Sequence, residues 1–188
     1  GGDKSEPRRS GPREPDFWVV RIDGEGKKLW DKTFGGNSHD YCRNAIALKD
    51  GSFLLLGDSQ SGVGGDRSEP NRGLSDMWVI KIDSNGKKVW DKAYGGDRYE
   101  YCSSGVALKD GSFLLAGPSD SLSGGEHSQP SRGGWDYWIL KVDGKGDKIW
   151  DRRYGGEGND GEAKIVRAKD GGFLLAGNSS SDASGDLS

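Results

Sequence analysis

Short apolar runs separated by glycine-containing turns recur along the chain. In the first copy, the runs predicted to be β-strands are residues 17–22, 28–34, 42–48 and 53–57. The turn at 83–86 in the second copy contains Asn-Gly, which is a strong hairpin signal. Each unit is therefore predicted to hold four short antiparallel strands, joined by two tight turns, one medium loop and one long loop.

The unit occurs three times in fixed register. The tryptophans that mark it are Trp18, Trp78 and Trp138 near its start, and Trp30, Trp90 and Trp150 further along. Equivalent positions recur with the same spacing each time, and no insertion or deletion falls between these points. A fixed period of this length, about 60 residues, indicates supersecondary units that stack on one another.

The predicted strands are apolar on consecutive positions. Residues 53–56 read Phe-Leu-Leu-Leu, and the equivalent segments 113–116 and 173–176 read Phe-Leu-Leu-Ala. A strand with one face in water alternates between apolar and polar residues, so these sheets are predicted to be covered on both faces. Such four-stranded antiparallel sheets are typical blades of an all-β β-propeller. A β-trefoil is the alternative, but its strands are apolar mainly on one side.

The order of the predicted strands indicates a split blade. An outer pair (16–34) comes first, two complete blades follow (41–94 and 101–154), and an inner pair ends the chain (164–177). Three blade-equivalents are too few for a flat ring. We therefore expect two chains to close a six-bladed homodimer, or the chain to be part of a longer propeller. The joint is heterologous, so an open polymer is the further alternative.

Charge and composition limit the classes of partner. The chain has 27 basic and 30 acidic residues, unclustered in the repeats, which argues against a nucleic-acid partner. No apolar segment approaches the ~20 residues that span a bilayer, so we expect a soluble chain without membrane insertion. Residues 1–15 are rich in Pro and Arg and are predicted to be a solvated, irregular N-terminal arm, followed by the three-repeat segment 16–188.

The two cysteines, Cys42 and Cys102, hold the same repeat position, where the third copy has Glu162. Equivalent positions lie a whole unit apart, so a disulfide between the two is not expected. They are predicted to be buried or half-buried free thiols.

Candidate binding residues lie on the rim that carries the long, variable loops. They are the carboxylates Asp40, Glu100 and Asp160 at the entry to the innermost strand, the loop arginines Arg72 and Arg132, and Trp135 just before a strand. The functional interpretation is a polar ring for a ligand or cation at the channel mouth. The structural interpretation is that the carboxylates cap loop amides. Trp18, Trp78 and Trp138 are predicted to pack between blades.

No catalytic, cofactor or metal motif is present. The turns at Asp23, Asp83 and Asp143 lack the spaced oxygen ligands of a calcium loop and are predicted to be hairpin turns. His39 and His127 occupy non-equivalent positions, so they form no metal-ligand pair.

The repeat resembles that of a known class of proteins. Its marks are the segment 76–96, with its two tryptophans and final Tyr-Gly-Gly, and the later pattern Lys-Asp-Gly-x-Phe-Leu-Leu-x-Gly. These resemble tandem repeats of secreted and cell-surface bacterial proteins, many of which carry a type IX secretion sorting signal. They are more distantly similar to kelch-type blades. The resemblance implies a β-propeller at the cell surface or outside the cell, and it says little about a ligand.

Two functions are compatible with these features. The first is a non-enzymatic extracellular propeller module for binding or assembly, with itself, a glycan or a cell-surface protein as partner. The second is a lectin-like propeller, or an enzyme acting on polysaccharide with Asp40, Glu100 or Asp160 as acid and base. Such an enzyme needs two carboxylates roughly 5 to 10 Å apart.

Overall fold

The computed structural model describes residues 2–122 and 124–186, which contain strands, turns and loops and no helix. The twelve strands are β1 (Phe17–Ile22), β2 (Lys28–Phe34), β3 (Asp40–Ala47), β4 (Phe53–Ser59), β5 (Asp76–Ile82), β6 (Lys88–Tyr94), β7 (Ser104–Ala107), β8 (Phe113–Ser119), β9 (Asp136–Val142), β10 (Lys148–Tyr154), β11 (Asp160–Arg167) and β12 (Phe173–Ser179). The predicted all-β fold class is confirmed.

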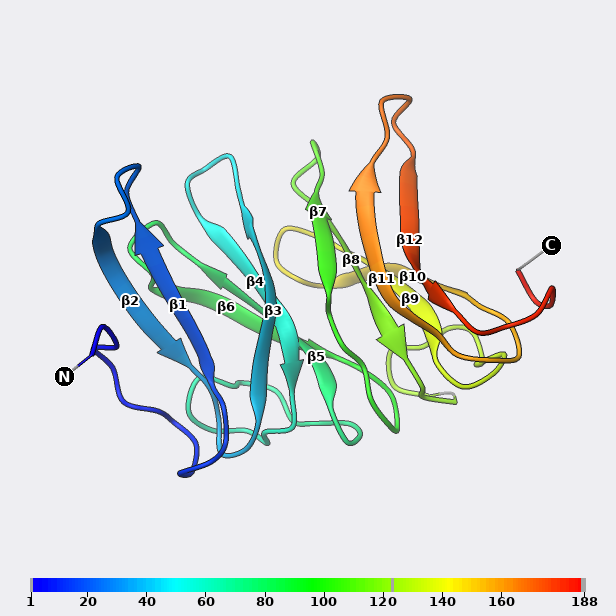
Figure 1. Cartoon of the computed structure of the whole chain (residues 1–188), viewed down its shortest axis with the longest axis horizontal. Helices are drawn as coiled ribbons and strands as arrows, with labels where there is room; N and C mark the ends of the chain where they lie inside the picture. The colour runs from blue at the N-terminus through cyan, green and yellow to red at the C-terminus, as the bar shows by residue number, and fades with distance from the viewer. Residues whose placement is uncertain (1, 123, 187–188) are drawn as a thin grey trace.

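The strands form four antiparallel sheets (Figure 1). Their orders are β1-β2, then β3-β4-β5-β6, then β7-β8-β9-β10, then β11-β12. This is the predicted succession of one outer pair, two complete four-stranded units and one inner pair. Strand pairing therefore crosses the sequence repeat, because the second half of one copy shares a sheet with the first half of the next.

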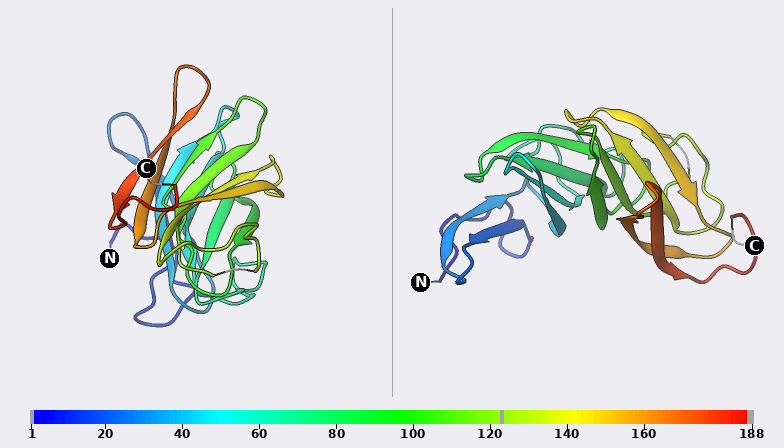
Figure 2. Two further views of the ribbon diagram at one scale, coloured as in Figure 1. Left: turned by 90° about the vertical axis from the view of Figure 1, so that its right-hand side faces the viewer. Right: turned by 90° about the horizontal axis from the view of Figure 1, so that it is seen from above.

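The four sheets stack face to face along an open arc, and the two chain ends lie at its opposite tips (Figure 2). The innermost strands succeed one another along it, since β3 contacts β7 and β7 contacts β11. The sheets do not close on one another within the described part of one chain. The trefoil alternative is wrong, because its strands would form one barrel and these form separate stacked sheets.

The core lies between successive sheets and uses alternate residues of each strand. On β4, Leu55 packs toward β1 and β2 together with Phe17. Leu54 and Leu56 pack the other way, in a cluster that includes Leu115 of the next sheet. All of these side chains are buried. The prediction of sheets covered on both faces is confirmed for the two complete sheets.

A tryptophan–aspartate pair links the first and second strand of each sequence repeat. The indole Nε1 donates to the carboxylate in Trp18–Asp31 at 3.1 Å, in Trp78–Asp91 at 3.1 Å and in Trp138–Asp151 at 3.0 Å. Pairing matters because an unpaired buried indole N–H or carboxylate is costly. Trp78 and Trp138 are fully buried between sheets as predicted, whereas Trp18 is exposed.

Hydrogen bonds hold the carboxylate of Asp151 in its charged form. Burial alone would raise its pKa, but Lys148, the Ser128 amide and the Trp138 indole outweigh it and lower the pKa to about 2. Lys148 Nζ lies 2.8 Å from this carboxylate, which is 1% exposed. This contact explains why the repeat carries Lys three residues before Asp.

Residues 2–15 contain no strand, in agreement with the predicted irregular arm, but they are not a freely solvated one. The Ser5 amide donates to Asp31, and the Thr33 amide donates to Glu6. The same bonds recur one repeat later, from the Ser68 amide to Asp91 and from the Ala93 amide to Glu69. The arm thus docks on β2 through the same contacts that the long loop before β5 makes with β6.

Both cysteines are free thiols, as predicted. Cys102 is buried, and burial raises the pKa of its thiol to about 12. Cys42 is exposed, which corrects the prediction that both are buried or half-buried. The cause is positional. Sheet β3-β6 covers Cys102, whose amide donates to Gly57 at 3.3 Å, whereas within residues 2–122 and 124–186 no inner strand precedes β3, which carries Cys42.

Candidate functional site

The three predicted carboxylates are buried and cap the Gly-Gly loops. The accepted amide hydrogen bonds run from Gly36 to Asp40 at 2.8 Å, from Gly96 to Glu100 at 3.0 Å and from Gly156 to Asp160 at 2.7 Å. Each carboxylate also accepts from serine hydroxyls of the loop that follows the next strand, such as Ser61 on Asp40 at 3.0 Å. The hydrogen bonding agrees with the interpretation that these carboxylates cap loop amides.

Burial removes these side chains from a solvent-facing ring, since none is more than 2% exposed. Burial also raises the pKa of Asp40. At Asp160, burial opposes but does not overcome the hydrogen bonds from Ser179, Gly156 and Ser181, which lower its pKa. Each carboxylate that would contact a polysaccharide instead accepts hydrogen bonds from the protein's own loops.

A buried arginine lies under each complete sheet's loop, a feature that we did not predict from the sequence. Arg67 lies 3.4 Å from Asp76, and both side chains are fully buried. In the next sheet the place of Arg67 is taken by His127, which lies 3.2 Å from Glu100, and the cation comes instead from Arg153, 3.8 Å from Asp136. Both complete sheets therefore contain a buried arginine near the equivalent aspartates Asp76 and Asp136, although the two arginines hold different positions in the repeat.

The two predicted arginines link neighbouring sheets. Arg72 donates to the Ala93 carbonyl at 2.9 Å and to Glu126 at 3.2 Å. Arg132 donates to the Arg153 carbonyl at 3.1 Å and pairs with Asp186. Each guanidinium thus joins the sheet of its carbonyl partner to the loop that follows the inner strand pair of the next sheet, and these contacts account for the recurrence of the residue.

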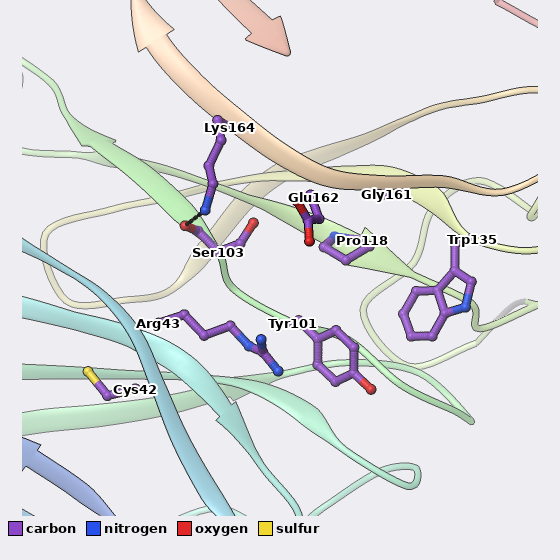
Figure 3. A pocket seen from close by; sticks show the side chains of 9 residues that line it. All are labelled: Cys42, Arg43, Tyr101, Ser103, Pro118, Trp135, Gly161, Glu162 and Lys164. Atoms are coloured by element: carbon purple, nitrogen blue, oxygen red, sulfur yellow. Dashed lines mark hydrogen bonds between the residues drawn. The ribbon is translucent and has the colours of Figure 1, made fainter. Parts of the chain in front are cut away.

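Trp135 lies in a cavity of about 550 Å³ (Figure 3). It is half-buried, and its ring is 5.2 Å from that of Tyr101, with 24° between the planes. The other polar side chains that line the cavity are Arg43, Ser103, Glu162 and Lys164. Of the predicted site residues, the structure places only Trp135 in this cavity.

The two tips of the arc expose apolar residues whose repeat equivalents are buried. On β1, Ile22 is 57% exposed, whereas Ile82 and Val142 are fully buried. On β12, Leu174 is 61% exposed, against 0% for Leu54 and 2% for Leu114. Each tip is also hollowed. A cavity of about 380 Å³ lies beside β1, β3 and β4, and one of about 210 Å³ lies between Tyr137, Tyr154 and Leu175.

Within residues 2–122 and 124–186, no group of three or more His, Cys, Asp or Glu side chains is arranged to hold a metal ion. The same residues include no helix of the length and apolarity that a bilayer span requires.

No family model matches the chain. It is 28% identical over 170 residues to "Regulatory protein FlaEY" of Caulobacter vibrioides, and the match covers 86% of this chain but 18% of FlaEY. The chain thus spans less than a fifth of that relative. A solved protein of unknown function from Bacteroides caccae is similar over 86% of this chain and 50% of its own, with 15% identity and a TM-score of 0.48. The resemblance to secreted kelch-like repeats stays a prediction.

Proposed function

We propose that the chain is a non-enzymatic assembly module whose sheets are propeller blades, and that two copies join at the tips of the arc to complete a six-bladed ring. The observation that carries the proposal is the exposure of Ile22 and Leu174 at positions that both complete sheets bury. An edge strand with unpaired backbone N–H and C=O groups beside exposed apolar side chains can pair with a strand of another chain.

The internal repeats specify how the two tips would pair. In the complete sheets, Leu55 lies opposite Ile80 in β4 and β5, and Leu115 lies opposite Leu140 in β8 and β9. The same register places Leu175 of β12 opposite Val20 of β1 in a second copy. A shift by one residue would turn every side chain to the wrong face, so this register is the expected one.

The side chains at such a junction are complementary. Trp138, Leu140 and Val142 pack on the preceding sheet together with Leu54 and Leu56. By the same repeat relation, the exposed face of β1 would cover the face of the third sheet that carries Leu114, Ala116 and Ile139. Leu174 would in turn enter the cavity of about 380 Å³ beside β1 and β4 of the second copy.

A hydrogen bond between two neighbouring sheets has a donor and an acceptor that both recur at the tips of the arc, without a partner among the described residues. The hydroxyl of Tyr94, which is buried, donates to the Gly146 carbonyl of the next sheet at 2.5 Å. Tyr154 is the equivalent residue in the last complete sheet, and it is exposed. Its acceptor would be Gly26 of a second copy. Gly86 and Gly146 lie against the preceding sheet, whereas no atom lies within 4 Å of the position that a Cβ would take at Gly26.

The sequence motifs alone support three further parts of this proposal. These are the extracellular or cell-surface setting, secretion as type IX cargo, and the relationship to kelch-like repeats. The carboxylates that suggested the enzyme alternative are buried and bonded to loop amides, which supports a non-enzymatic role. The glycan-binding alternative does not need these carboxylates.

Cysteine cross-linking tests the junction and its register. Ala176 and Val19 would face each other across β12 and β1, as Leu56 faces Val79. In a Cys42→Ser background, the double variant Val19→Cys/Ala176→Cys should form a covalent dimer under mild oxidation, since antiparallel neighbours lie within disulfide range. The control Val20→Cys/Ala176→Cys points the two thiols to opposite faces and should not cross-link. Equal yields from both pairs, or no dimer from the first, would refute the proposal.

A further inference from the structure

The cavity that contains Trp135 is built by three successive sheets. Arg43 comes from β3, Tyr101 and Ser103 precede β7, and Glu162 and Lys164 come from β11. Its volume of about 550 Å³ lies within the range of small-ligand sites. Because all of these residues belong to one chain, the site is complete without a second copy.

Aromatic rings form one wall of the cavity. Tyr101 and Trp135 are nearly parallel at 5.2 Å, and Tyr99 lies 6.4 Å from Trp135. In Figure 3 the rings of Tyr101 and Trp135 lie side by side, with their faces turned in the same direction. An aromatic face carries negative charge density and attracts weakly positive C–H bonds, such as those on the flat side of a pyranose ring.

The polar side chains beside this wall have hydrogen-bond donors and acceptors that the described part of the protein does not use. Arg43 lies 4.4 Å above the Tyr101 ring and binds Asp58 through Nε, one of its five N–H donors. Lys164 donates to the Ser103 carbonyl at 3.0 Å and has two further donors. Among the described residues, the Glu162 carboxylate has neither a hydrogen-bond nor an ion-pair partner.

The backbone of Glu162 is also unusual. Its φ of 56° makes it the one non-glycine residue with positive φ in the described part of the chain. This left-handed conformation costs of order 1–3 kcal/mol in a non-glycine residue, and such residues cluster at functional sites. The equivalent residues in the other copies, Cys42 and Cys102, do not share it.

The charges of the cavity cancel. Arg43 is paired with Asp58, and Lys164 and Glu162 carry opposite charges on the same strand. An anion would therefore meet no net positive charge, whereas hydroxyl groups can use the donors and the acceptor together. We propose that this cavity binds a neutral saccharide, with a pyranose ring against Trp135 and Tyr101 and its hydroxyls bonded to Arg43, Glu162 and Lys164.

The test uses the full chain and four neutral tetrasaccharides: cellotetraose, maltotetraose, xylotetraose and chitotetraose. We expect at least one to show saturation-transfer NMR signals and a binding isotherm by calorimetry. Trp135→Ser should weaken this binding about tenfold or more, since an aromatic contact contributes on the order of one decade of affinity. Serine already stands at the equivalent position as Ser75, so the fold accepts it there. The control Trp150→Ser alters a partly exposed tryptophan outside the cavity and should leave the affinity within about twofold.

Three results would overturn this proposal: no binding of any of the four tetrasaccharides, binding of their sulfated forms alone, or unchanged affinity of Trp135→Ser. A chain that stays monomeric contradicts the assembly proposal and leaves this one intact, because one chain supplies every residue of the cavity. Conversely, a cross-linked dimer that binds no sugar contradicts this proposal alone.

Discussion

Replacing Leu174 by Ala should weaken the association of two copies. Full burial of a leucine side chain is worth about 1.5–3 kcal/mol, and 61% of Leu174 remains to be buried, which gives about 0.9–1.8 kcal/mol per junction. A two-copy ring has two junctions, so the loss is about 2–4 kcal/mol. The dissociation constant should therefore rise about 30- to 700-fold.

Sedimentation equilibrium over a dilution series measures this change as a shift in the transition between the monomer mass of 20.2 kDa and twice that mass. Leu29→Ala is the matched control. Leu29 is 53% exposed on β2, and its equivalents Val89 and Ile149 are exposed as well, so no neighbouring sheet covers this position. The control should leave the dissociation constant unchanged within about twofold.

The reasoning is refuted if the two leucine variants weaken association equally, because exposure alone would then explain the effect. It is also refuted if the unmodified chain keeps the monomer mass at the highest concentrations. In that case the exposed face of β12 has another occupant, such as further repeats of a longer chain.

Three further predictions concern the stability of the single chain. Asp151→Asn should lower the free energy of unfolding by about 2 kcal/mol above pH 4, because the Asp151 pKa of about 2 in the folded state lies below the unfolded value near 3.9. Urea titrations should show this difference vanish as the pH falls from 4 to 2. Gly117→Ala should destabilise by about 2 kcal/mol or more, since a Cβ would lie 1.6 Å from the Tyr101 carbonyl, whereas Gly24→Ala meets no atom within 4 Å and should change stability by less than about 0.5 kcal/mol. Glu162→Gly should raise the thermal midpoint by relieving about 1 kcal/mol of strain, while removing the cavity's carboxylate.

Local signals made the strand order predictable. Turn residues fix where each strand ends, and consecutive apolar residues such as Leu54, Leu55 and Leu56 show that a sheet is covered twice. The burial of Asp40 was not predictable in the same way. It depends on Ser61, 21 residues further along, folding back over the carboxylate. The same contact recurs in the other copies, from Ser121 to Glu100 and from Ser181 to Asp160, but recurrence in the sequence does not show that the two residues meet.

The cavity was only partly predictable for a related reason. Trp135 stands out in the sequence because it has no counterpart in the other copies, but Arg43 and Tyr101 belong to different copies and meet only in the folded chain. A usable signal was nevertheless present. At the start of the inner strand the copies read Tyr-Cys-Arg-Asn, Tyr-Cys-Ser-Ser and Gly-Glu-Ala-Lys, while the neighbouring fourth strands hardly change. Divergence at the start of the inner strand, beside fourth strands that stay nearly constant, indicates a surface used asymmetrically.

A mixing experiment separates the two-tip junction from a symmetric contact. Because β12 of one copy would meet β1 of the next, a ring contains two like junctions, each with two different sides. Leu174→Lys blocks the β12 side by placing a second cation opposite Arg21, and Ile22→Glu blocks the β1 side with a buried charge. Each variant alone then has only impaired junctions and should be monomeric.

An equimolar mixture of these two variants should recover a dimer, since β12 of the Ile22→Glu copy and β1 of the Leu174→Lys copy are both intact. That dimer has a single good junction, so its affinity should be well below that of the unmodified ring. A contact made by the same surface on both copies would give no such rescue, because every pair would contain an altered side. Mixtures that stay at the monomer mass would therefore contradict the proposed heterologous closure even if the unmodified chain is dimeric.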